Sequence, residues 1–216
     1  MRKVKANTDK HDFSADALPY PEAKQDTRER TFRYVQAMPQ WNGYLTKDLI
    51  DLCGSQSEIL KMLLARNYLQ PGQGMYKGVD RDPAVIAANQ AYFAAEIAEG
   101  LCDFRCAEWN DVIRTPWASK ATIFTFDGFD SVVKRSLRAT LGPTLLRVKE
   151  CKKQYGEALL YLNLSNRTKA DLTGYLAYLS EALSSEALKV TITGKQVHVY
   201  HSNTIDMVSI WFRLGF

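Results

Sequence analysis

Residues 49–183 alternate between short apolar runs and segments with helical spacing, and this alternation constrains the fold more than any other feature. Five runs have the length and composition of strands, at residues 49–53, 75–80, 101–109, 121–127 and 157–165. The segments between them place apolar side chains three and four residues apart, as in Ile59, Met62 and Leu63. Strands that alternate with helices form a parallel sheet covered on both faces. The sequence therefore predicts an α/β domain.

The two ends of the chain depart from this alternation. Residues 189–202 and 205–214 are two alternating runs with no helix between them, so they must pair antiparallel or skip a position in the sheet. At the other end, residues 1–28 read as a polar arm, followed by a short helix with Asp26 or Thr27 as its N-cap. We expect an arm and short helix over residues 1–40 and one domain over residues 41–216.

Glycine and proline predict where the intervening helices begin, end or break. Asp82 and Pro83 mark the start of a helix that runs to Gly100. A long basic segment over residues 131–155 contains Gly142-Pro143, which predicts a break in its helix.

Composition and charge place the chain among ordinary globular proteins. Its 216 residues are 46% hydrophobic and 24% charged, with a net charge of +4. A mildly basic chain can bind nucleic acid but does not require it. There is no apolar run of membrane-spanning length and the N-terminus is polar, so we expect a cytoplasmic protein without a secretory signal or membrane contact. Four cysteines without a C-x-x-C pair are expected to be reduced thiols, and we predict no metal site.

An acidic residue stands at the end of each of the first four strands. In an open α/β sheet, ligands bind at the carboxyl ends of the strands. A single acid there can equally be a helix cap or a surface charge, but four in succession favour a ligand that has hydroxyl and amino groups. These residues are Asp51, Asp80, Glu108 and Asp127.

The first of these turns, in LIDLCGSQSEILKMLL, carries a cluster of small residues between a strand and a helix. Small residues let the backbone approach a ligand closely. Cys53, Ser55 and Ser57 stand at alternate positions after Asp51, whereas Gly54 lies out of that register.

These motifs together resemble the class I S-adenosylmethionine-dependent methyltransferases, over roughly residues 44–216. The first motif of that family has an acid and three small residues, usually glycine, at alternate positions, and Asp51, Cys53, Ser55 and Ser57 take those places. The resemblance implies a seven-stranded, mostly parallel α/β sheet of order 3-2-1-4-5-7-6, with strand 7 antiparallel and helices on both faces.

The resemblance also implies a cofactor, S-adenosyl-L-methionine, and its product S-adenosyl-L-homocysteine. Asp51 and the turn of Cys53, Gly54, Ser55 and Ser57 would hold the methionine part. Asp80, with Arg81 beside it, would hold the ribose hydroxyls. Glu108 would accept from the adenine amine, while Trp109 would stack or offer a backbone N–H. Asp127 would lie against both cofactor and acceptor and is our candidate catalytic residue.

The methyl acceptor is left open between nucleic acid and a small molecule. The sequence after the fourth strand, Asp127-Gly128-Phe129-Asp130, lacks the N-P-P-Y motif of exocyclic-amine methyltransferases. Phe129 could stack on a planar acceptor, and a basic helix could hold a nucleic-acid backbone. The residues of that helix nearest the sheet edge are Lys134, Arg135 and Arg138.

Two other functions fit parts of the sequence. The replaced glycines could mark a non-catalytic binding or scaffold module that kept the fold. An NAD(P)-dependent oxidoreductase would also place an acid after the second strand, but G-x-G-x-x-G is absent.

Overall fold

The computed structural model describes the backbone of residues 15–16, 20–38, 41–54, 57–131, 134–165, 171–183, 191–202 and 205–215. Within these ranges it leaves out the side chains of residues 15–16, 20–21, 127–131, 134–140, 151–153, 182–183, 201–202 and 205. All that follows concerns the described atoms.

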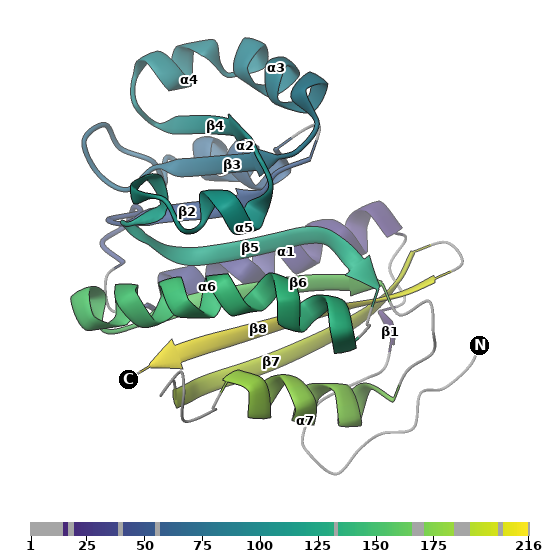
Figure 1. Cartoon of the computed structure of the whole chain (residues 1–216). Coiled ribbons are helices and arrows are strands. Elements are labelled where there is room, and N and C mark those ends of the chain that lie inside the picture. Colours follow the sequence, from purple (N-terminus) through teal and green to yellow (C-terminus); the bar gives the residue numbers. More distant parts are fainter. Residues whose placement is uncertain are drawn as a thin grey trace.

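The strands of the described chain form one sheet, in the order β1-β7-β8-β6-β5-β2-β3-β4 (Figure 1). They are β1 (Ala15–Asp16), β2 (Asp48–Leu52), β3 (Tyr76–Asp80), β4 (Cys102–Cys106), β5 (Ala121–Ser131), β6 (Ala158–Ser165), β7 (Thr191–Ser202) and β8 (Ile205–Gly215). Only β8 runs antiparallel to its neighbours, β6 and β7. Counted from β2, this is the predicted order 3-2-1-4-5-7-6, and the two-residue β1 extends it beside β7.

Helices cover both faces of the sheet. They are α1 (Tyr20–Gln36), α2 (Glu58–Ala65), α3 (Pro83–Tyr92), α4 (Ala94–Ala98), α5 (Trp109–Val112), η1 (Pro116–Ala118), α6 (Lys134–Tyr155) and α7 (Leu172–Leu183). In Figure 1, α5, α6 and α7 lie in front of the sheet, with α1 and α2 behind it. No helix in the described part of the chain is long and apolar enough to cross a membrane.

Two apolar cores result, one on each face. Neighbouring strand residues enter opposite cores, as Leu159 and Leu160 of β6 do, because successive side chains of a strand point to opposite faces. The core behind the sheet contains Phe32 of α1, Ile59 of α2 and Phe93, which lies between α3 and α4. The helices therefore fix the sheet from both sides and hold its carboxyl edge in place.

The first helix begins earlier than predicted. It starts at Tyr20, so Asp26 and Thr27 lie inside it rather than at its N-cap. Thr27 is buried and faces β7, with its Oγ1 3.1 Å from His198 Nδ1. The indole of Trp211 on β8 donates to Thr31 Oγ1 at 2.9 Å. The polar threonines thus bind the sheet instead of capping a helix.

Two helix boundaries also differ from the prediction. The helix α6 continues through Pro143, where we predicted a break. Leu141, Leu145 and Val148 of this helix are buried in the front core, and their packing offsets the hydrogen bond that proline lacks. Conversely, the helix expected to reach Gly100 divides at Phe93, whose ring stacks on Phe104 at a centroid distance of 5.9 Å.

Candidate functional site

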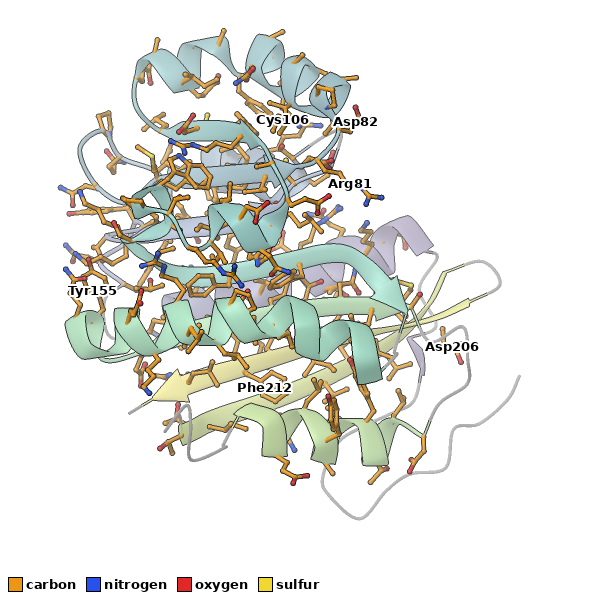
Figure 2. All side chains as sticks on the ribbon, in the orientation of Figure 1. Arg81, Asp82, Cys106, Tyr155, Asp206 and Phe212 are labelled. Carbon is orange, nitrogen blue, oxygen red and sulfur yellow. The ribbon has the colours of Figure 1, made fainter. Side chains whose placement is uncertain are left out.

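The carboxyl ends of β2, β3, β4 and β5 meet at one edge of the sheet, on the right in Figure 1. Parallel pairing sets Leu52 beside Val79 and Asp80 beside Cys106. Figure 2 shows Arg81, Asp82 and Cys106 gathered at this edge. The acids predicted from the strand ends therefore follow neighbouring strands at a common edge.

Two of the described residues in the turn between β2 and α2 have a backbone in the left-handed region. Gly54 has φ of +56° and Ser57 has φ of +42°. The glycine out of register with the family's motif is thus placed where the backbone needs one. Ser57 holds this conformation with a side chain, at a cost on the order of 1–3 kcal/mol.

The side chains that replace two of the usual glycines point into the protein. Cys53 is 8% exposed and its thiol lies 3.6 Å from the carbonyl of Val79. Ser57 is 1% exposed, and its hydroxyl donates to Asn89 Oδ1 at 3.0 Å. Neither of these two side chains therefore narrows the outer face of the turn. Ser55, the third replacement, lies outside the described residues.

Asp51 lies beneath the turn and is bound by two hydroxyl groups. Tyr76 donates to Oδ2 at 2.7 Å and Thr125 donates to Oδ1 at 2.6 Å. The carboxylate is 2% exposed. Burial, and then the charge of Asp51, raise the pKa of Tyr76 well above its usual value. Asp51 therefore supports the turn from within, and direct contact with a ligand stays a prediction.

The thiol of Cys53 is not a nucleophile in this structure. Burial, followed by the charge of Asp51, raises its pKa to about 12. A thiol with that pKa stays protonated at neutral pH, and the thiolate is the reactive form.

Asp80 ends β3 with one carboxylate oxygen already engaged. Its Oδ1 accepts the backbone N–H of Asp82 at 2.9 Å, and no hydrogen bond from the described residues reaches Oδ2. Asp82 in turn caps α3 by accepting from the N–H of Ala84 at 2.9 Å. Arg81 is exposed at the same edge (Figure 2). Asp80 is thus fixed in direction and keeps an oxygen for a ligand.

The neighbouring residues Glu108 and Trp109 differ in burial: the carboxylate of Glu108 is exposed, and the ring of Trp109 is buried. Glu108 is exposed just before α5, and its side chain makes no capping hydrogen bond. The indole of Trp109 is buried and donates to Thr144 Oγ1 at 2.8 Å. It packs on the ring of Phe126, with the two ring centroids 4.2 Å apart. In this structure the indole is therefore packed inside the protein, and no face of it lies open for a ligand to stack on. The backbone N–H of Trp109, at the first position of α5, remains the predicted contact.

The predicted acceptor residues are described by their backbone alone. Asp127 and Phe129 belong to β5, at an irregularity in its pairing with β6 between Phe126 and Phe129. Bulges of this kind are frequent beside active sites because they redirect side chains. Lys134, Arg135 and Arg138 lie in the first turns of α6. Their side chains are outside those described, so their roles stay predictions.

Asn89 on α3 is a residue of this site that the sequence analysis did not identify. It is 2% exposed and donates to the carbonyl of Gly54 at 2.8 Å. A signal was present, because Ile86, Asn89 and Phe93 follow the spacing of a buried helix face. An asparagine at a buried position needs hydrogen-bond partners, and here the turn supplies them.

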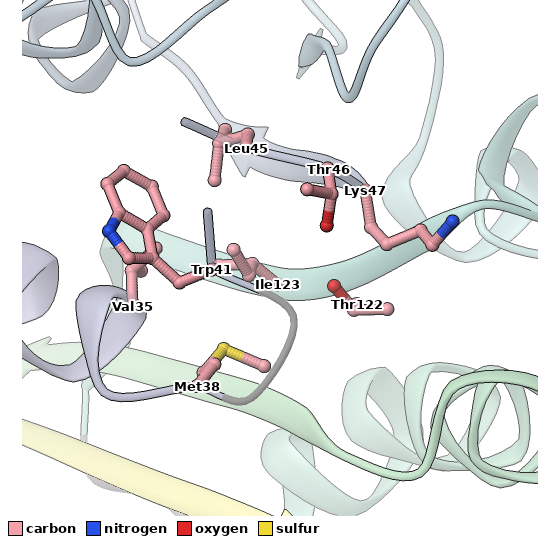
Figure 3. A pocket seen from close by; sticks show the side chains of 8 residues that line it. All are labelled: Val35, Met38, Trp41, Leu45, Thr46, Lys47, Thr122 and Ile123. Carbon is pink, nitrogen blue, oxygen red and sulfur yellow. The ribbon is translucent and has the colours of Figure 1, made fainter. Parts of the chain in front are cut away.

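A small pocket among the described residues lies away from this edge. It opens where β5 begins, between the end of α1 and the segment before β2 (Figure 3). Val35, Met38, Trp41 and Thr122 are among its lining residues. Within the described part of the chain, no three histidine, cysteine or acidic side chains could hold a metal ion.

By sequence, the chain matches no protein-family model and no curated protein. Its fold is shared by solved methyltransferases. TYW2 of M. jannaschii, solved in complex with AdoMet, has a TM-score of 0.59 at 9% identity, covering 94% of this chain and 81% of its own. ChlM, the magnesium protoporphyrin IX methyltransferase of Synechocystis PCC 6803 with bound SAH, has a TM-score of 0.56 at 11% identity, covering 94% and 90%.

A third such structure is the N-methyltransferase NodS from Bradyrhizobium japonicum WM9. Its TM-score is 0.55 at 10% identity, over 92% of this chain and all of its own (100%). At these identities the likeness shows the fold, which is that of the class I methyltransferases. The antiparallel β8 separates this fold from the all-parallel dinucleotide-binding order.

Proposed function

We propose that this protein is an S-adenosylmethionine-dependent methyltransferase whose cofactor lies across the carboxyl ends of β2 to β5. One observation carries the proposal. Cys53 and Ser57, which stand where the family usually has glycine, point their side chains into the protein. At these two positions the turn after β2 therefore keeps its outer face free of side chains, although the family's usual glycines are replaced. The loss of those glycines is then compatible with cofactor binding.

Each end of the cofactor would meet a different part of this edge. The backbone of the turn at Cys53, Gly54 and Ser57 would hold the methionine part, and the buried charge of Asp51 would favour its ammonium group. Asp80 would accept from the ribose hydroxyls through its remaining oxygen. Glu108 would accept from the adenine amine, and the N–H of Trp109 would donate to the adenine ring.

The cofactor would supply a methyl group on a sulfonium, which is transferred by in-line displacement. The protein's own part is to hold the acceptor in line with the methyl group and to keep water out. We place Asp127 and Phe129 on the acceptor side, where Asp127 would take the proton that the acceptor loses. Lys134, Arg135 and Arg138 would bind phosphates, which favours a nucleic-acid acceptor over a small molecule.

The proposal includes a cytoplasmic location. The support is that Cys53, Cys102 and Cys106 are free thiols, two of them buried. Free thiols are typical of reducing compartments.

Calorimetric titration of the purified chain tests the proposal. S-adenosylmethionine and S-adenosylhomocysteine should bind, and NAD, the control ligand, should not. Methyl transfer from labelled cofactor to tRNA, DNA and small-molecule pools would then identify the acceptor. A folded sample that binds neither cofactor would overturn the proposal in favour of a scaffold module. Binding of NAD alone would indicate an oxidoreductase.

A further inference from the structure

We infer that Asn89 is a positioning residue that holds the turn after β2 in its ligand-accepting shape, together with Ser57. This inference rests on the proposed function for its meaning in catalysis. The contacts that support it exist in the protein without any ligand.

Asn89 reaches three residues of the turn with one side chain. Its Nδ2 donates to Gly54 O at 2.8 Å and lies 3.9 Å from Cys53 Sγ, while its Oδ1 accepts from Ser57 Oγ at 3.0 Å. These partners are 32 to 36 residues away in sequence. Both ends of the amide are therefore used to hold one loop to a neighbouring helix.

The turn needs such a holder because Ser57 has an alternative. A residue at the N-cap of a helix normally has an extended backbone, and its hydroxyl accepts from the first free N–H groups. Ser57 occupies that position before α2, yet it has φ of +42° and makes no side-chain capping bond. Its hydroxyl is given to Asn89 instead. Without Asn89, Ser57 would be more stable with the extended backbone and capping hydrogen bond of an ordinary N-cap residue. The rest of the turn would then change its conformation as well.

Asn89 is itself held rigidly. It lies between Ile86 and Phe93 on the buried face of α3, and the ring of Phe93 stacks on Phe104 of β4. The same helix begins at the Asp82 cap, whose N–H binds Asp80. The helix α3 therefore positions both the candidate ribose acid and the turn that faces the methionine part.

The test is a double-mutant cycle between positions 57 and 89. We expect Asn89→Ala to weaken S-adenosylhomocysteine binding by about tenfold or more, which is about 1.4 kcal/mol. Ser57→Gly is the second single variant of the cycle, because glycine adopts a positive φ without a partner and has no hydroxyl to cap α2. The double variant should recover to within about threefold of Ser57→Gly. A role in general stability alone predicts no such recovery.

Gln90→Ala is the matched control, because Gln90 follows Asn89 on α3 and contacts Phe104 O rather than the turn. It should bind the cofactor product as the parent does. If Asn89→Ala does not fold, Asn89→Asp keeps the acceptor for Ser57 but sets an oxygen against Gly54 O, and it should also weaken binding.

Amide hydrogen exchange without ligand separates this inference from the proposed function. Asn89→Ala should speed exchange in residues 53–60, and Ser57→Gly should reduce that effect. If the parent binds no cofactor, the proposed function fails, but this exchange result still tests the positioning role. Unchanged exchange and unchanged binding in Asn89→Ala would overturn the inference, as would a loss of binding that Gln90→Ala shares.

Discussion

Replacing Asp80 with alanine should remove most of the cofactor affinity while costing little stability. One carboxylate oxygen binds the N–H of Asp82 at 2.9 Å, and the other has no partner among the described residues. Hydrogen bonds to a charged group contribute about 1.5–3 kcal/mol each. Two ribose hydroxyls on Asp80 would then contribute about 3–6 kcal/mol, or roughly 10²- to 10⁴-fold in affinity.

Asp82→Ala is the matched control for this loss. Asp82 also accepts one backbone N–H at 2.9 Å, and it stands only two residues further on. Removing this helix cap should lower the free energy of unfolding by about 1 kcal/mol. Since Asp82 uses its carboxylate on α3, we expect cofactor affinity to change by less than about threefold. The two variants therefore resemble each other in stability and differ in binding.

Calorimetric titration with S-adenosylhomocysteine, paired with urea unfolding of the same samples, measures both quantities. Asp80→Asn should fall between the parent and Asp80→Ala, because the amide keeps one acceptor and loses the charge. Equal losses of affinity in Asp80→Ala and Asp82→Ala would show that the effect is structural. Parent-like binding by Asp80→Ala would refute the placement of the ribose.

Three further predictions concern the interior. Tyr76→Phe should lower the free energy of unfolding by about 2 kcal/mol in urea titrations, because it removes a hydrogen bond to the buried carboxylate of Asp51; a change below about 0.5 kcal/mol would contradict that bond. The raised pKa of Cys53, about 12, favours the neutral thiol in the folded state, so its contribution to stability is complete below the unfolded pKa of 9.0 and is lost as pH rises towards 12. Above pH 9 the free energy of unfolding should therefore fall less steeply with pH in Cys53→Ala than in the parent. An equal dependence on pH in the two proteins would contradict the raised pKa of Cys53. Pro143→Ala should raise the thermal midpoint, since the added N–H can complete the ladder of α6, and an unchanged midpoint would indicate that this turn was already relaxed.

Much of the fold follows from the sequence because the informative patterns are local. Apolar runs bounded by turn residues predicted the parallel strands, and Asp82-Pro83 predicted the start of α3. The two closing runs without a helix between them required either antiparallel pairing or a skipped position, and β7 and β8 pair antiparallel. The resemblance to a family then supplied the strand order, which the structure confirms.

The sequence-based predictions differ from the structure where packing overrides a local preference. Pro143 should break a helix, but buried leucines on both sides of it hold α6 together. Trp109 follows a strand end as a stacking residue would, yet its ring fills the core between β5 and α6. Neither outcome could be read from neighbouring residues, because each depends on partners more than ten positions away.

The sequence by itself determined the order of strands and helices and which acids stand at the carboxyl edge, because backbone period and strand polarity are properties of consecutive residues. The tertiary structure decided the directions of the side chains there. In the folded chain, the side chains of Cys53 and Ser57 point inward and Tyr76 donates a hydrogen bond to Asp51. Asn89 is hydrogen-bonded to Ser57 in the turn. Those contacts join residues 25 to 32 positions apart, and they form only when β2, β3 and α3 are packed together.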